Sequence, residues 1–182
     1  MGGIRTDHTG QSRTLRGLFA CGEAACWDMH GFNRLGGNSV AETVVAGMIV
    51  GEFVADFVTT REGDLQMSTS LAREFLGREQ ARLDALLAAS GPENAFVLVR
   101  AMQEVMTAKV GIFRDGPALE QAVQELQRLL ARSRDLGLRA RFPAANPELT
   151  AAYRLPRMLK LALCVAYGAL ERTESRGAHY RE

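Results

Sequence analysis

The second part of the chain has the repeating pattern of apolar and polar positions that is typical of amphipathic helices. Segments 71–89, 93–113, 117–136 and 147–174 each end at glycine, proline or polar stop signals. We therefore expect a bundle of helices here. The third segment carries one apolar stripe, formed by Leu119, Val123, Leu126, Leu129 and Leu130. The residues expected in the shared core include Phe96, Met102, Val105, Leu159, Leu163 and Tyr167.

A long apolar run, residues 40–58, precedes these segments and predicts another helix, which begins at Ser39 and ends near Thr60. Ser39-x-x-Glu42 matches a capping box, in which the serine caps the helix and the glutamate reaches back to it. The run also contains charged residues: Glu42, Glu52 and Asp56. An acid at the centre of a membrane-spanning helix costs on the order of 2.5–3.5 kcal/mol. The sequence therefore predicts a long buried helix of a soluble domain.

Two short strand-like runs, residues 2–7 and 15–21, come before this helix and are separated by a turn-prone stretch. No Gly-x-Gly-x-x-Gly motif follows a strand, and no β-α-β unit can be recognised. Residues 1–60 thus predict only part of an α/β domain. A polar connector, 61–70, joins it to a helical domain, 71–182, so that the expected fold class is mainly α.

Composition narrows the possible functions. Apolar residues make up 47% and charged residues 24% of the chain, as in ordinary soluble domains, and a net charge of +1 argues against a nucleic-acid-binding protein. The three cysteines, Cys21, Cys26 and Cys164, lack the spacing of paired metal ligands and fit a reducing compartment. The histidines also lack metal-ligand spacing.

The candidate chemistry lies just before the long helix. Arg34 offers a fork of donors that suits a carboxylate or phosphate, and Gly36 and Gly37 let a ligand approach the backbone. The helix N-terminus attracts an anion or an electron-rich ring. In the alternative reading, this is an ordinary glycine turn with a solvated arginine. Glu23, which follows the second strand-like run, could bind a sugar hydroxyl or simply cap a turn.

Three ordered sequence blocks, 1–7, 17–24 and 30–39, resemble the end of the flavin-binding domain in the succinate dehydrogenase and fumarate reductase flavoprotein family. The tail 172–181 is similar to the same family, and residues 25–29 resemble its menaquinol-linked fumarate reductases. L-aspartate oxidases share the overall pattern but tend to carry Ala-Ser in place of the two glycines before Asn38. The respiratory flavoproteins are therefore the better match.

The resemblance implies that a spectrin-like three-helix bundle follows the FAD-binding segment. It also implies interconversion of succinate and fumarate by hydride transfer with FAD. Arg34 matches the arginine that binds a substrate carboxylate, and the cofactor-binding positions match Glu23, Asn38, Ser39 and Val40. The expected partners are an iron–sulfur subunit and a membrane anchor subunit on the cytoplasmic side of the inner membrane. Neither nucleic acid nor direct membrane insertion is expected.

Further catalytic and nucleotide-binding groups of the family belong to segments that precede residue 1 of this sequence, and the family chain continues after Glu182. We therefore expect this chain alone to be inactive and to bind FAD weakly or not at all. Two alternatives remain open at this point. The chain could be a stand-alone helical interaction module or split-gene half that docks on a partner flavoprotein, or it could be an L-aspartate oxidase fragment.

Overall fold

The computed structural model describes residues 3–31, 33–60 and 68–182. It divides into two units, Met1–Gln66 and Met67–Glu182. The expected connector, 61–70, falls largely on residues 61–67, which lie outside the described part of the chain.

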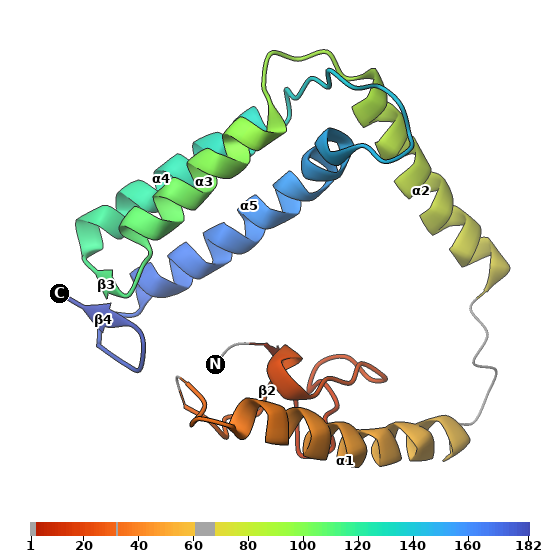
Figure 1. Cartoon of the computed structure of the whole chain (residues 1–182), viewed down its shortest axis with the longest axis vertical. Coiled ribbons are helices and arrows are strands. Elements are labelled where there is room, and N and C mark those ends of the chain that lie inside the picture. The colour runs from red at the N-terminus through yellow and green to blue at the C-terminus, as the bar shows by residue number, and fades with distance from the viewer. Residues whose placement is uncertain (1–2, 32, 61–67) are drawn as a thin grey trace. The chain divides into compact units, whose positions relative to one another are not determined.

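The second unit is helical, as the apolar pattern predicts. Its helices are α2 (Thr69–Ala88), α3 (Ala95–Lys109), α4 (Gly116–Arg132) and α5 (Pro147–Glu171). Helices α3, α4 and α5 run alongside one another and pack pairwise as a three-helix bundle (Figure 1). The mainly α fold class is thus confirmed.

Local sequence signals explain where these helices begin. The side chain of Asn94 accepts hydrogen bonds from the first-turn amides of α3, and those of Asp115 and Asn146 do the same for α4 and α5. Pro117 and Pro147 occupy first-turn positions, where a missing N–H costs nothing. Each cap satisfies backbone donors that the helix itself leaves without an acceptor.

The core of the bundle matches the predicted stripe of α4. Side chains that are fully buried include Leu98, Leu119, Leu126, Leu155 and Leu159. Two aromatic residues expected in the core are instead exposed: Phe96 by 50% and Tyr167 by 42%. Phe96 lies two positions before the inward-facing Leu98, which turns it to the other side of α3. The hydroxyl of Tyr167 accepts a hydrogen bond from Gln127 at 2.5 Å, so its polar end stays near the surface.

Helix α2 is attached to the bundle in a different way, because none of its residues is buried. One contact with α5 is made by Tyr153, whose ring lies under the guanidinium carbons of Arg82 and Arg157 at 4.7 and 4.5 Å. The Tyr153 hydroxyl donates to Glu79 on α2 at 2.5 Å. Leu83, Leu86 and Leu87 of α2 are partly buried and pack against the core of the bundle, so the cation–π and hydrogen-bonding contacts add to an apolar contact.

The first unit has short strands and one long helix. Strand β1 (Ile4–Arg5) pairs in parallel with β2 (Ala25–Cys26), which follows the 3-10 helix η1 (Gly22–Ala24). The predicted second strand, residues 15–21, is wrong. Gly17 has a φ of +85° and turns the chain inside that run, which therefore forms only an isolated bridge between Gln11 and Phe19.

Helix α1 (Asn38–Thr60) forms close to the predicted position. It buries a single stripe, Glu42, Ala46 and Val50, and it packs against η1. The predicted burial of this helix is therefore confirmed for this stripe only. The described residues of the first unit leave the other faces of α1 exposed or partly exposed. By length and composition alone α1 could cross a membrane, but the core helices of soluble proteins share that property. The charged residues within it still argue against insertion.

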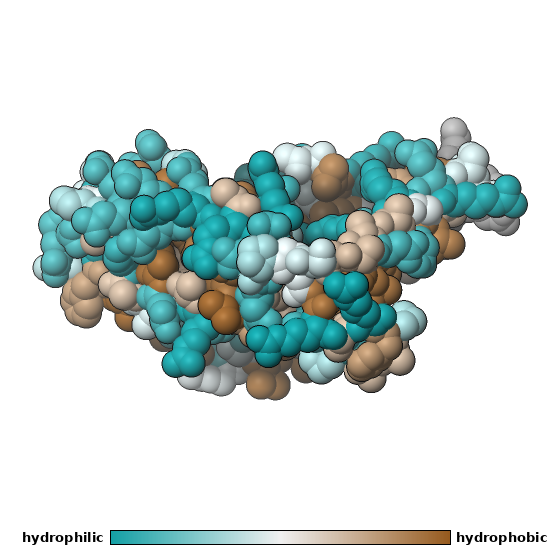
Figure 2. Space-filling model, turned by 90° about the horizontal axis from the view of Figure 1, so that it is seen from above, coloured by the Kyte–Doolittle hydropathy of each residue, from teal (hydrophilic) through white to brown (hydrophobic). Residues whose placement is uncertain are grey.

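Exposed large apolar residues occur in both units. In α1 they include Val40, Val44, Val45, Met48 and Ile49. Figure 2 shows brown hydrophobic residues exposed between teal hydrophilic ones on the face that it draws. Isolated apolar residues are normal on protein surfaces, but those on α1 lie on consecutive turns of one helix.

Candidate functional site

The carboxylate of Glu42 is the centre of a buried polar cluster in the first unit. Its Oε1 atom accepts a hydrogen bond from Trp27 Nε1 at 2.9 Å. Its Oε2 atom accepts from Arg34 Nε at 2.6 Å and contacts His30 Nε2 at 2.7 Å. The residue is only 6% exposed. Three side chains from the loop before α1 therefore converge on the second turn of that helix.

These contacts contradict the predicted capping box. Helix α1 begins at Asn38, so Ser39 lies inside its first turn rather than at the cap position. Both oxygens of Glu42 are engaged by Trp27, His30 and Arg34 rather than reaching back along the helix. The buried guanidinium of Arg34 requires a counter-charge, and this requirement outweighs the small stabilisation that a capping box offers.

Glu42 is ionised at neutral pH. Burial alone would raise the pKa of Glu42, but hydrogen bonds from Arg34, Trp27 and His30 outweigh burial and hold that pKa below its usual value. Because an ionised carboxylate only accepts hydrogen bonds, His30 must donate through Nε2. This fixes a proton on that ring nitrogen.

Arg34 is buried, so the alternative of a solvated surface arginine is wrong. The side chain is 3% exposed, and besides Glu42 it reaches the carbonyl oxygen of Gly22 through Nη2 at 3.2 Å. Among the described residues, Nη1 has no hydrogen-bond acceptor. The closest carboxylate oxygen on that side is Glu23 Oε1, at 3.9 Å. A buried donor that lacks an acceptor is a candidate for binding a ligand.

Two other predicted positions lie at the start of α1, where the helix leaves amides without acceptors. The amide of Ala41 already bonds to the Gly37 oxygen, whereas the amides of Ser39 and Val40 precede that first helical bond. Val40 is 72% exposed. A Cβ atom added at Gly37 would meet nothing within 4 Å, although its φ of +82° favours glycine. The helix N-terminus is therefore open.

The remaining predicted residues are accessible as well. The side chain of Glu23, in η1, is 72% exposed, so its carboxylate is available to a ligand hydroxyl. Asn38 is the first residue of α1, and its amide bonds to the Leu35 oxygen. The structure thus places Arg34 beside Glu23, with Asn38, Ser39 and Val40 together at the helix start.

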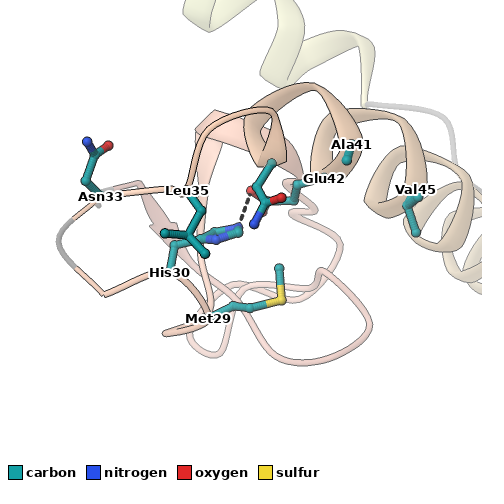
Figure 3. Close-up of a pocket in the computed structure, with 8 residues that line it drawn as sticks. Met29, His30, Asn33, Leu35, Ala41, Glu42 and Val45 are labelled. Carbon is teal, nitrogen blue, oxygen red and sulfur yellow. Dashed lines mark hydrogen bonds and ion pairs between the residues drawn. The ribbon is translucent and has the colours of Figure 1, made fainter.

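A pocket of about 520 Å³ opens beside the cluster (Figure 3). Its lining residues are Met29, His30, Asn33, Leu35, Asn38, Ala41, Glu42 and Val45. Half of these residues are apolar, and the polar half consists of the hydrogen-bonded pair His30 and Glu42 together with Asn33 and Asn38. Ligand pockets likewise combine apolar walls with polar groups that orient the ligand.

Sequence reasoning missed Trp27, His30 and Glu42 as members of one cluster. Glu42 is separated from Trp27 by 15 positions and from His30 by 12, so no local pattern joins them. The available signal was an acid within an otherwise apolar helix. Such an acid is costly to bury unless donors surround it.

Two family models match separate parts of the chain. Residues 1–40 match a model described as FAD binding domain, and residues 99–182 match one described as fumarate reductase flavoprotein C-term. The first match includes every residue of the candidate site up to Val40. The second covers α4, α5 and most of α3.

Individual relatives extend the similarity over the whole chain. The chain is 50% identical over 181 residues to a fumarate reductase flavoprotein subunit of Helicobacter pylori, and 34% identical over 182 residues to a succinate dehydrogenase flavoprotein subunit of Bacillus subtilis. It covers 25% and 31% of these two relatives. The chain therefore spans only about a quarter to a third of their length.

The fold is similar to solved structures as well. An E. coli quinol fumarate reductase structure matches 99% of this chain with a TM-score of 0.86 and 34% sequence identity. The matched part is 30% of that chain. The sequence comparison and the structure comparison therefore both find that this chain is similar to part of a fumarate reductase.

Proposed function

Because this chain is related in sequence and fold, over its whole length, to flavoprotein subunits of succinate dehydrogenases and fumarate reductases, we propose that it forms part of such a subunit. The proposed activity is the interconversion of succinate and fumarate by hydride transfer with FAD. The observation that carries the proposal is the buried Arg34, whose Nη1 atom has no hydrogen-bond acceptor among the described residues. A dicarboxylate substrate would supply that acceptor.

In this proposal Arg34 binds one carboxylate of the substrate. Its Nε and Nη2 atoms already donate to Glu42 and to the Gly22 oxygen, which leaves Nη1 for the substrate. A guanidinium holds a carboxylate in a defined plane, and this orients the carbon atoms between which hydrogen is transferred. Lysine would supply the charge without that geometry.

The residues around the helix start fit FAD. The exposed carboxylate of Glu23 can accept hydrogen bonds from ribityl or ribose hydroxyls. Asn38 and the amides of Ser39 and Val40 would face the isoalloxazine ring, where the positive end of the α1 dipole favours electron density. When bound, FAD supplies the hydride-accepting and hydride-donating chemistry. The match of residues 1–40 to an FAD-binding domain supports this assignment.

The proposed partners are an iron–sulfur subunit and a membrane anchor subunit, with the flavoprotein on the cytoplasmic side of the inner membrane. The similarity to a quinol fumarate reductase supports an assembly that exchanges electrons with quinol. In this assembly the chain contacts the membrane only through its partners. The acids within α1 favour that arrangement over direct insertion.

A chimera tests the proposal. Residues 1–182 replace the matching quarter of the Helicobacter pylori subunit, and the bleaching of flavin absorbance by succinate is measured. We expect stoichiometric FAD and succinate-dependent bleaching in the chimera. Arg34→Lys should slow bleaching and Arg34→Ala should slow it more, whereas Arg13→Ala, an exposed arginine, should behave like the parent. A fully active Arg34→Ala chimera would overturn the assignment of Arg34.

A further inference from the structure

We propose that Glu42 is a positioning residue, which sets the orientation of Arg34 toward the substrate. This inference rests on the proposed function, in which Arg34 binds a substrate carboxylate. Glu42 does not contact the substrate in this proposal. It acts through its 2.6 Å hydrogen bond to Arg34 Nε.

The geometry of the guanidinium supports this role. A guanidinium is planar, so two hydrogen bonds from different nitrogens fix both its position and its plane. Arg34 makes these two bonds with Glu42 Oε2 and the Gly22 oxygen. The hydrogens of Nη1 and the second hydrogen of Nη2 remain on the outer edge of the fork. That edge is the one that can bind a carboxylate in a bidentate way.

Glu42 is itself held in place. Trp27 donates to its Oε1 atom and His30 donates to its Oε2 atom, and its side chain is 3% exposed. With donors on both oxygens the carboxylate cannot rotate freely. Trp27 and His30 therefore orient the carboxylate of Glu42, and Glu42 in turn orients the guanidinium of Arg34.

Stability alone gives a poor account of this cluster. A buried ion pair is often no more stabilising than apolar side chains of similar volume. The rest of the buried stripe of α1, Ala46 and Val50, is apolar. An acid at position 42 is understandable if it keeps a buried arginine charged and correctly turned.

The charge of Glu42 leads to a specific kinetic expectation. Its negative charge opposes the attraction between Arg34 and an anionic substrate, so Glu42 orients Arg34 at some loss of electrostatic attraction. Removing the charge should leave substrate binding intact or tighter while misaligning the reacting atoms. The loss should therefore appear in kcat and not as a raised KM.

The test uses the complete chimeric flavoprotein with Glu42→Gln. We expect kcat for succinate oxidation to fall about tenfold or more, with KM for succinate unchanged or lower. Glu52→Gln is the matched control, because Glu52 is exposed on the same helix, and it should leave both constants unchanged. Unchanged kcat in Glu42→Gln, or an effect confined to a raised KM, would overturn the proposal.

Trp27→Phe provides a second variant that leaves both Glu42 and Arg34 in place. It removes the donor to Glu42 Oε1, so we expect a smaller fall in kcat, again without a raised KM. If the Glu42→Gln chimera does not fold, Trp27→Phe becomes the deciding variant, and an unchanged kcat in it would overturn the proposal. The Arg34 and Glu42 variants also separate the two proposals. A fully active Arg34→Ala chimera would contradict the proposed function. An inactive Arg34→Ala chimera together with an unimpaired Glu42→Gln chimera would contradict only the positioning role of Glu42.

Discussion

Arg114 and His179 are hydrogen-bonded across 65 positions of the second unit, with 2.7 Å between Nη1 and Nδ1. Because a guanidinium can only donate, His179 must accept through Nδ1 and donate through Nε2, which lies 3.1 Å from the Arg172 oxygen. The bond lies beside the two-residue strands β3 (Phe113–Arg114) and β4 (Tyr180–Arg181). His179 therefore ties the C-terminal strand to the bundle.

Replacing His179 should loosen this strand. A hydrogen bond to a charged group contributes about 1.5–3 kcal/mol, so His179→Ala should raise the exchange rates of nearby strand amides by about 10-fold to 100-fold. The reporting amides are those of Tyr180 and Glu182, which bond to the oxygens of Ile112 and Arg114. Hydrogen exchange measured by mass spectrometry checks this. Unchanged exchange would mean that the strand is held by its backbone pairing alone.

Tyr153→Phe should weaken the attachment of α2, and the effect should depend on pH. The hydrogen bond from Tyr153, followed by the charges of Arg157 and Arg82, holds the pKa of Glu79 below its ordinary value of 4.5, against the opposing effect of burial. A lowered pKa in the folded state stabilises the protein above the unfolded-state pKa, and this contribution is lost as pH falls through the folded-state pKa. The difference in the free energy of unfolding between the parent and Tyr153→Phe should be largest near neutral pH and should decrease in acid. Thermal unfolding at a series of pH values measures it, and a difference independent of pH would contradict the prediction.

Glu148 is the second buried acid whose removal should be costly. Its Oε2 atom accepts from the amides of Arg139 and Ala140 at 2.9 and 3.0 Å, and Oε1 accepts from the Asn94 side chain at 3.2 Å. Glu148→Ala would leave three partly buried donors without this acceptor, so we expect a loss of stability below the cost of about 1–3 kcal/mol that each fully buried donor would carry. Urea unfolding should show this loss, whereas Glu120→Ala, at an exposed position of α4, should change stability little.

The second unit should fold by itself. Among the described residues, those that form its hydrophobic core belong to the second unit, with Leu98, Leu126 and Leu159 fully buried. We therefore expect a fragment of residues 68–182 to be helical by circular dichroism and to unfold in one cooperative transition. A fragment that lacks a cooperative transition would show that residues 1–67 are needed to complete its core.

The helices of the second unit could be predicted because their signals are local. Asn94, Asp115 and Asn146 are residue types that favour the cap position and lie directly before their helices, and the stripe of α4 repeats at helical spacing. The same local reasoning failed at Ser39 and Glu42. There the capping signature competes with a buried arginine, and the stronger electrostatic requirement decides the outcome.

The candidate site could be predicted only in part, for a similar reason. The importance of Arg34 followed from its place before the helix and from the family resemblance. Its burial and its bond to Glu42 depend on how the loop folds back over α1, which the composition of the loop does not encode. The strand β2 is also invisible in the sequence, because a two-residue strand has no period to detect.

The apolar surface of α1 has a consequence for the fate of the chain in the cell. Val40 and Met48 are 72% and 70% exposed, and neighbouring valines extend the same surface. Chaperones and proteases act on proteins that display such surfaces, and uncovered apolar patches also promote aggregation. A chain that keeps this face uncovered would be held by chaperones or degraded by proteases. The amount of the chain that accumulates then depends on how quickly the face is covered, so α1 connects assembly to abundance.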